Sequence, residues 1–303
     1  PLRKELGLSD GEFALLVAIP ILTGSVLRVP IGLLTDVLGG RVVFTALLLV
    51  TAVPTFLVGY ADSYGALLVL AFCLGLAGTS FAVGIAWVSA WYPRRNQGFA
   101  LGTFGAGNVG ASVTKLLAPL MVTLVAAGGA VGGVVPGGWR FVPFVYALAL
   151  LAMAAVVWFA SPVPDLRPGR HRSLREMARP LRVLRVWRFG LYYIVVFGAY
   201  VALALWLPKY YVDVYGLELR EAGMLTSLFI FPARLLRPLG GWLSDRVGAR
   251  AVTYTAFVVM CLALVALAFP MAIRPFTALV VLVGVTMGIG KASVYKYIAD
   301  YFP

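Results

Sequence analysis

The sequence is poor in charged side chains, above all acidic ones, and in the residue types that build most catalytic and metal centres. Only 12% of its 303 residues are charged, with 12 Asp and Glu against 25 Lys and Arg, and it has one histidine and two cysteines. A soluble domain carries about a quarter charged residues. No Ser-His-Asp set, metal-ligand cluster or Walker pattern is present, so we expect no enzyme, no cofactor and no ATP-driven pump. Cys73 and Cys261 lie inside apolar runs and predict neither a disulfide nor a metal site.

Apolar residues dominate instead. They make up 61% of the chain, and the mean hydropathy is +0.94. A transmembrane helix needs roughly 20 mainly apolar residues, and about nine segments have that length. The sequence therefore predicts an all-α polytopic membrane protein. The expected spans are 12–38, 42–61, 64–91, 98–127, 139–160, 186–208, 220–244, 250–272 and 275–301.

The basic residues predict the orientation, because short cytoplasmic loops are enriched in Lys and Arg. They gather in alternate loops, around Arg41, Arg94 and Arg246 and throughout the polar stretch 162–185. We therefore expect a multi-pass protein of the cell inner (cytoplasmic) membrane, with residues 1–9 outside and 162–185 cytoplasmic. The same distribution argues against a nucleic-acid partner. The polar stretch separates two predicted helix bundles, 1–161 and 186–303, as a cytoplasmic linker.

An internal repeat relates the two bundles. An offset of 209 residues superimposes Gly7–Val43 on Gly216–Val252. Internal symmetry of this kind is typical of transporter folds. Within it, GLLTDVLGGR and GWLSDRVGAR fall at matching cytoplasmic ends of spans, where glycines allow close helix approach and Asp and Arg can pair across a seam that opens. We assign these loops to gating rather than to cargo binding, through Gly32, Asp36, Arg41, Gly241, Asp245 and Arg250.

Two arginines related by the repeat, Arg28 and Arg237, lie at a depth in the membrane where a charged side chain is energetically costly. At about 1.5 Å per residue, each lies about 12 Å from the cytoplasmic Asp of its loop, near the middle of a hydrocarbon core of about 30 Å. The planar fork of Arg donates two parallel hydrogen bonds to a small flat oxyanion. The alternative is a structural arginine that bonds backbone carbonyls at the helix kinks that Pro30 and Pro238 would permit.

Other cations accompany this pair, whereas no Asp or Glu lies near the middle of any predicted span. Lys291 lies at midplane depth in the last span and is a further candidate ligand. Arg234, Lys115 and Lys296 receive no role from the sequence. A cavity lined by cations and free of carboxylates should attract an anion.

The two repeated loops resemble the signature loop of the major facilitator superfamily. In that family the loop follows the second and eighth helices of a 6+6 helix bundle. The resemblance therefore implies a fragment that runs from about helix 2 to helix 10.

The fourth span, GTFGAGNVGASVTKLLAP, contains GAGNVG after a cytoplasmic YPRRNQG stretch. This segment resembles the nitrate signature of the nitrate/nitrite porter family within that superfamily. The resemblance implies that Arg28 in GSVLRVPIG and Arg237 in LLRPLGG are the paired arginines that clamp the anion, and that Asn108 is the signature asparagine. The signature glycines, which we expect to serve close packing, are Gly105, Gly107 and Gly110.

Three aromatic residues resemble those that flank the substrate in that family: Phe81 in GTSF, and Tyr193 and Phe197 in YIVVFG. Phe81 and Asn108 each lie about 15–18 Å from their cytoplasmic ends, which is midplane depth. Aromatic faces would exclude water from a flat anion. Each of the three could equally be core or lipid-facing packing.

The resemblance implies a monomeric secondary transporter of nitrate and nitrite that works by alternating access in the lipid bilayer, as in nitrate assimilation. The tenth span, GIGKASVYKYI with Lys291, resembles that of a bacterial branch of the family associated with proton-coupled nitrate uptake. Proton symport is therefore preferred over nitrate/nitrite exchange. Exchange needs no proton carrier and fits the lack of buried carboxylates. Two other functions remain open: an organic phosphate or anion exchanger of the same superfamily, and a membrane anion sensor without transport.

Overall fold

The computed structural model describes residues 5–125, 129–131 and 135–301, and most of them are helical. The chain forms two compact units, unit 1 with Pro1–Ala90 and Ala111–Met177, and unit 2 with Trp91–Gly110 and Ala178–Pro303. Each unit is considered by itself below. The grouping puts 91–110, which the sequence assigns to the first bundle, with unit 2, and the predicted bundles and linker stay a prediction. Residues 1–4 of the predicted outer segment lie outside the described residues.

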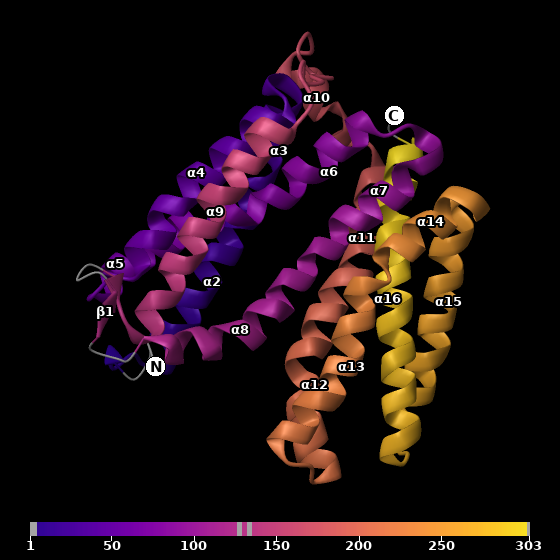
Figure 1. Ribbon diagram of the computed structural model, residues 1–303. Coiled ribbons are helices and arrows are strands. Elements are labelled where there is room, and N and C mark those ends of the chain that lie inside the picture. The colour runs from indigo at the N-terminus through magenta and orange to yellow at the C-terminus, as the bar shows by residue number, and fades with distance from the viewer. Residues whose placement is uncertain (1–4, 126–128, 132–134, 302–303) are drawn as a thin grey trace. The chain divides into compact units, whose positions relative to one another are not determined.

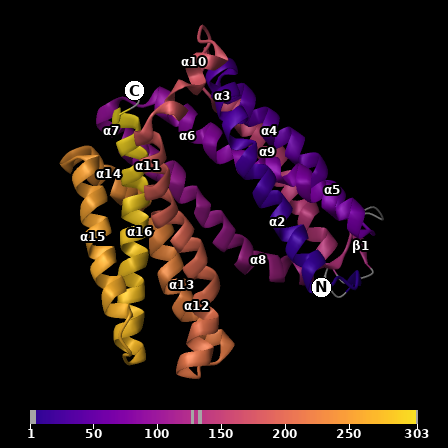
Figure 2. The same ribbon diagram turned by 180° about the vertical axis from the view of Figure 1, so that it is seen from behind.

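Unit 1 is built mainly around α4 and α9, which run side by side (Figures 1 and 2). Small side chains such as Ala52, Ala147 and Ala154 are buried and let these helices approach closely. The elements of unit 1 are α2 (Asp10–Val26), α3 (Arg28–Leu38), α4 (Gly40–Val58), α5 (Tyr64–Leu74), η1 (Gly75–Thr79), α6 (Ser80–Trp91), α8 (Gly110–Leu124), β1 (Ala130–Val131), β2 (Val135–Pro136), η3 (Gly138–Arg140), α9 (Phe141–Ala160) and α10 (Leu174–Ala178). The strands β1 and β2 pair antiparallel.

Unit 2 packs around α16, in which every residue from Gly290 to Tyr297 is buried. Glycines bring α13 against it: a Cβ built at Gly284 would lie 2.6 Å from the carbonyl oxygen of Phe229. Helices α13, α14 and α15 all contact α16 (Figure 1). The elements are α7 (Arg94–Ala106), η2 (Gly107–Val109), η4 (Arg179–Arg182), α11 (Leu184–Tyr193), the π-helical η5 (Ile194–Gly198), α12 (Ala199–Tyr215), α13 (Leu219–Leu235), α14 (Arg237–Val247), α15 (Ala249–Leu267) and α16 (Ile273–Tyr301).

Six helical stretches of the described chain are long and apolar enough to cross a membrane, and the bent pair α2–α3 makes a seventh. Two other predicted spans, 98–127 and 220–244, are helical where described but do not qualify. Each is divided into shorter helices: η2 separates α7 and α8, of 13 and 15 residues, and the break at Leu236 separates α13 and α14, of 17 and 11 residues. The structure thus supports six or seven of the nine predicted spans.

The internal repeat is visible in the backbone. Helix α2 breaks from α3 at Leu27 with a bend of 42°, and α13 breaks from α14 at Leu236, 209 residues later. Pro30 and Pro238 follow the breaks and lack the N–H that would continue the α-helical pattern. Each break therefore leaves an arginine as the first residue of the second helix.

Glycines with positive φ recur at the same offset. Gly7 and Gly216 have φ of 60° and 67°, and Gly39 and Gly248 have φ of 93° and 98°. L-residues rarely adopt such backbone angles. The turns that precede and follow the paired helices are therefore built alike in both units.

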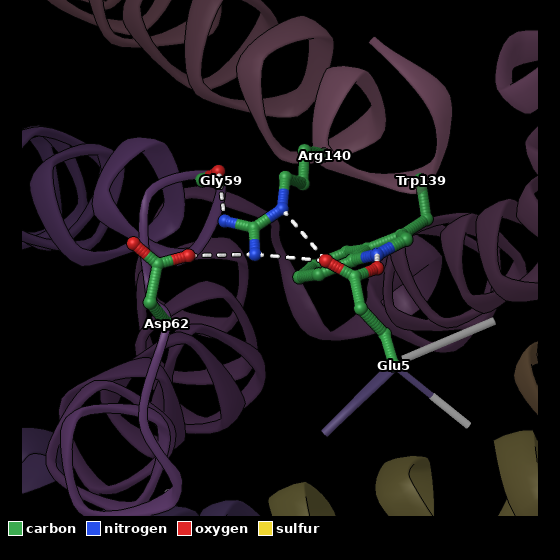
Figure 3. A network of polar contacts seen from close by, with 5 residues as sticks. All are labelled: Glu5, Gly59, Asp62, Trp139 and Arg140. Carbon is green, nitrogen blue, oxygen red and sulfur yellow. Dashed lines mark hydrogen bonds and ion pairs between the residues drawn. The ribbon is translucent and has the colours of Figure 1, made fainter. Parts of the chain in front are cut away.

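A polar network fixes the start of α9 in unit 1 (Figure 3). Arg140 donates from Nη2 to Asp62 at 2.7 Å and to Glu5 at 3.0 Å, and from Nη1 to the Gly59 carbonyl at 3.1 Å. Trp139 donates its indole N–H to the other carboxylate oxygen of Glu5. One guanidinium thus joins the segment before α2, the α4–α5 connection and the start of α9.

We expect Gly248→Ala to lower the stability of the protein by about 1–3 kcal/mol, because φ of 98° and ψ of 131° strain any L-residue. Nothing lies within 4 Å of a Cβ built there, so crowding does not add to the strain. The measurement is SDS-induced unfolding of the purified protein in detergent. Gly223→Ala, in the interior of α13 with open space around it, is the control and should be neutral or stabilising. Equal effects of both substitutions would contradict the interpretation.

We also expect acid to weaken the network of Figure 3 through Glu5. Hydrogen bonds from Trp139 and Arg140 hold the pKa of Glu5 below its ordinary value of 4.5. A lowered pKa means that the carboxylate stabilises the fold above pH 4.5 and that this contribution disappears as the pH falls through the lowered value. Thermal unfolding of wild type and Glu5→Gln between pH 7 and pH 3 tests this. The variant should be less stable at pH 7 and should lose less on acidification, whereas parallel curves would refute the assignment.

Candidate functional site

Arg237 is the first residue of α14, directly after the helix break in unit 2. Its side chain is 1% exposed. Nη1 donates to the carbonyl of Gly105 in α7, and Nε donates to the carbonyl of Ala233 at 3.4 Å. It makes no ion pair with a carboxylate in the described part of the chain. Backbone dipoles alone therefore hold this buried charge.

Gly105 makes the room that this arrangement needs. A Cβ built there would lie 3.3 Å from Cδ of Arg237 and 3.6 Å from Cε2 of Tyr295. Helix α7 ends one residue later and continues as the short 3₁₀ turn η2. A Cβ at Gly107 or Gly110 would meet nothing within 4 Å, so only Gly105 of the three predicted signature glycines is in close packing among the described residues.

Arg234 lies one turn before Arg237 and is also held from both sides. Its Nε donates to the hydroxyl of Tyr200 at 2.8 Å, and its Nη1 donates to the backbone carbonyl of Asn108 at 3.0 Å. The backbone of the predicted signature asparagine thus positions this arginine. The Asn108 side chain is half-buried, and no hydrogen bond joins its amide to the described residues.

Lys291, in α16, is 1% exposed and faces two aromatic rings. Its Nζ lies 3.5 Å from the ring centroid of Phe197 and 5.3 Å from that of Tyr193. The Tyr295 hydroxyl donates to the Tyr193 hydroxyl at 3.3 Å. Tyr193 directly precedes the π-helical segment η5, and Phe197 lies within it. Segments of this kind are frequent at functional sites.

These side chains form one continuous group, which we name the cationic-aromatic cluster. Its parts meet where Tyr295 and Arg237 approach Gly105, and where the rings of Phe197 and Tyr200 stack at 6.4 Å. No acidic residue occurs in the sequence between Glu221 and Asp245 or in 273–299. Three cations among ring faces, on helices that carry no nearby acid, suit an anion. The members are Tyr193, Phe197, Tyr200, Arg234, Arg237, Lys291 and Tyr295.

Unit 1 contains the repeat partner, Arg28, at the first position of α3. The arginine is half-buried; its Nη2 donates to the carbonyl of Gly78 at 3.3 Å, and its buried Nε has no hydrogen-bond partner in the described chain. Phe81, three residues beyond Gly78, is half-buried in the first turn of α6. Arg28 and Arg237 belong to different units, so the clamp between them stays a prediction.

The predicted gating loop of unit 2 forms a buried lock. Asp245 accepts hydrogen bonds from the backbone N–H groups of Gly98 at 2.9 Å and Phe99 at 2.8 Å. Lys296 lies 3.7 Å from the same carboxylate, and both side chains are 6% exposed. Gly241 packs its backbone against that of Gly98, so a Cβ at either glycine would collide with the other segment. The lock joins α7, α14 and α16.

The corresponding loop of unit 1 uses a different acid. The backbone N–H of Arg41 donates to Asp165 at 2.8 Å, and the Trp87 indole donates to the other oxygen of the same carboxylate at 2.9 Å. The Asp36 backbone carbonyl accepts from the Gly169 N–H at 2.9 Å.

Among the described residues, neither Asp36 with Arg41 nor Asp245 with Arg250 forms an ion pair within its own loop, and the predicted pairing across the seam stays a prediction. Arg250 lies instead over the ring of Tyr254, at 5.8 Å. A Cβ built at Gly32 would meet no described atom within 4 Å, so packing does not require a glycine at this position.

Sequence reasoning missed Asp165, Lys296, Tyr200 and Tyr295. Lys296 had a signal, since it is a cation inside an apolar span five residues after Lys291. Asp165 lay within the stretch interpreted as a linker, and the two tyrosines carried no motif. The side chain of Lys115 lies outside what the structure describes.

The whole chain, residues 1–303, matches the family described as Major Facilitator Superfamily. It belongs to that superfamily. A Thermus thermophilus protein named "Probable nitrate/nitrite antiporter NarK1" is 55% identical over 100% of this chain and 73% of its own length. A Mycobacterium tuberculosis protein, "Probable nitrate/nitrite transporter NarK2", is 34% identical over 99% and 74%. The Bacillus subtilis "Nitrite extrusion protein" is 32% identical over 98% and 72%.

A solved structure of the superfamily shows the same fold. The transporter FucP in its outward conformation has a TM-score of 0.74 and 17% identity, over 98% of this chain and 80% of its own. Together these similarities confirm the predicted all-α superfamily fold and the predicted membership of the nitrate/nitrite porter family. The chain is a multi-pass membrane transporter rather than an enzyme.

For this superfamily member we expect Asp245 and Lys296 to be energetically coupled. Asp245→Asn removes the charge that faces buried Lys296 and should cost up to about 3 kcal/mol, because it leaves a desolvated ammonium with a weaker partner. Asp300, 2.9 Å from the same Nζ, limits the loss. In the double variant Asp245→Asn/Lys296→Met the uncompensated charge is gone. The stability lost by the double variant should therefore be smaller than the sum of the losses in the two single variants.

Unfolding free energies in SDS give this double-mutant cycle. The exposed pair Lys209–Asp213, 3.7 Å apart, is the control, and Asp213→Asn should change stability by about 0–1 kcal/mol. Additive effects of the Asp245 and Lys296 substitutions would show that the lock is not a coupled pair.

Proposed function

We propose that this protein moves nitrate and nitrite across the cytoplasmic membrane by alternating access, with the anion bound at the cationic-aromatic cluster. The relatives named above support the substrate class, since their names specify nitrate, nitrite or both. The inner-membrane location, the orientation and the monomeric state are part of this proposal.

One observation carries the proposal: the buried guanidinium of Arg237, which donates only to backbone carbonyls and has no acidic partner in the described chain. A buried charge without a counter-ion is costly. A small anion beside it would remove that cost and accept two parallel hydrogen bonds from the guanidinium fork. The alternative from the sequence, an arginine that merely bonds carbonyls, accounts for the carbonyl contacts but not for the missing counter-charge.

The aromatic side chains favour a small, flat anion. Tyr193 and Tyr295 lie with ring centroids 5.9 Å apart, and Tyr193 and Phe197 at 5.3 Å. Large rings at these separations occupy the space that an organic phosphate would need. They also exclude water, and in a dry site charge-assisted hydrogen bonds are strong.

In this proposal Arg28 supplies the second half of the clamp. Its buried Nε has no partner among the described residues and can donate to an oxyanion. Phe81 flanks the same segment of unit 1. Anion binding would then draw the two bundles together, and the loops of Asp36 and Asp245 would gate access from the cytoplasm.

For the coupling mode we propose nitrate/nitrite exchange. The sequence preferred proton symport because of Lys291. In the structure that lysine faces the rings of Phe197 and Tyr193, and ring faces attract the charged ammonium. A lysine beside these rings can serve as a ligand for the exchanged anion. The name of the Thermus relative, an antiporter, also favours exchange.

Nitrate uptake into proteoliposomes of the complete protein tests the proposal, with internal nitrite or an inward proton gradient as alternative driving forces. Wild type should take up nitrate against internal nitrite, and Arg237→Lys should lower the uptake at least about tenfold, because lysine cannot provide the bidentate contact. Arg274→Lys, an exposed cation at the start of α16, is the matched control and should transport normally.

Each other outcome decides between alternatives. Uptake driven only by protons would replace exchange by symport. Uptake of organic phosphate without nitrate would favour the organic-anion exchanger. Anion binding to purified protein without flux would favour the sensor.

A further inference from the structure

Unit 1 has an apolar groove of about 480 Å³ between α4 and α9. None of the residues that line it is assigned to anion binding or gating, although Arg41, which borders one end, is also one of the predicted gating residues. Both helices contribute residues at the spacing of one helix face. On α4 these are Val42, Thr45, Ala46 and Leu49, and on α9 they are Leu151, Ala154, Ala155, Trp158 and Phe159. The two helices run side by side (Figures 1 and 2), and the groove lies along the first half of α4 and the second half of α9.

Small side chains create the groove and large exposed ones border it. Ala46, Ala154 and Ala155 leave the space, whereas Leu49 is 46% exposed and Phe159 is 82% exposed. An apolar hollow in a membrane-spanning face contacts hydrocarbon rather than water. Its shape suits a flexible acyl chain.

A cation lies at one end of the groove. Arg41 donates from Nε to the Trp158 carbonyl at 2.9 Å, and its guanidinium lies 4.3 Å over the Trp158 ring. Its backbone N–H is fixed by Asp165. The terminal nitrogens Nη1 and Nη2 donate to no described residue. The carboxylate of Asp165 is engaged by the Arg41 backbone and by Trp87, so it does not occupy these two donors.

A polar residue also lines the groove. Thr45 follows Arg41 by about one turn, or about 6 Å along α4. The residue is 7% exposed, and its hydroxyl has no hydrogen-bond partner in the described chain. The oxygen is itself covered by protein atoms, so Thr45 contributes to the wall of the groove rather than a hydrogen bond to the lipid.

We propose that this groove binds one anionic phospholipid, with the phosphate on Nη1 and Nη2 of Arg41 and an acyl chain between α4 and α9. The arginine fork matches a phosphate bidentately. The predicted orientation puts Arg41 at the cytoplasmic surface, where anionic lipids attract basic side chains. The site is separate from the cationic-aromatic cluster, and the lipid is a ligand rather than a transported substrate.

Native mass spectrometry of the complete, delipidated protein with added palmitoyl-oleoyl phosphatidylglycerol tests this site. One phosphatidylglycerol should be retained in preference to phosphatidylcholine. Arg41→Gln should reduce its affinity roughly tenfold, which corresponds to losing a charge-assisted contact. Ala155→Phe should fill the groove and reduce retention of both lipids, independently of any effect of Arg41 on folding.

Two matched controls should retain the lipid like wild type: Arg250→Gln, the repeat partner of Arg41, and Val156→Phe, an exposed residue that does not line the groove. Undiminished binding in Arg41→Gln or Ala155→Phe would overturn the proposal. Displacement of the lipid by millimolar inorganic phosphate would reduce the site to a free-anion site. An absence of any retained lipid would likewise overturn the proposal.

Discussion

The burial of arginine inside a membrane protein is the constraint on which much of this structure depends. A charged side chain at the centre of a bilayer costs at least about 2.5–3.5 kcal/mol on insertion scales. Arg237 meets this cost with carbonyls that the helices would otherwise use internally, at the break before α14 and at the end of α7. The position needs a helix break and a glycine opposite it. Pro238, next to the arginine in sequence, and Gly105, which faces it from α7, provide these two features.

The same constraint explains why the backbone repeats so closely over 209 residues. The breaks at Leu27 and Leu236 each present an arginine at the start of a helix, and the positive-φ glycines at Gly39 and Gly248 end those helices alike. The contacts made by the two repeated loops differ between the units. Asp245 binds the backbone of α7 and pairs with Lys296, whereas in unit 1 the Arg41 backbone is fixed by Asp165.

Much of this could be predicted from the sequence, because it depends on local or periodic features. Apolar length gave the helical class, prolines beside arginines gave the breaks, and the offset of the loops gave the symmetry. The pairings could not be predicted. Lys296 and Asp245 are 51 positions apart in the sequence, and Asp165 is 78 positions from Trp87 and 124 from Arg41, so tertiary packing decides these contacts. Six or seven of the nine predicted spans are long and apolar enough in the structure. The other two are divided, into α7 and α8 by η2 and into α13 and α14 by the break at Leu236.

The choice of side chains around Arg237 bears on which anions the protein can tell apart. A lysine would offer a point charge, which any anion of suitable size satisfies, whereas a guanidinium fixed by two carbonyls presents its remaining donors in one direction. Nitrate and nitrite both offer a pair of coplanar oxygens to such a fork. The rings of Tyr193 and Tyr295 lie beside it and limit the room for substituents outside that plane. If the proposed site is correct, discrimination against a tetrahedral phosphate would follow from shape, while nitrate and nitrite would share the feature that the fork recognises, as the proposed exchange requires.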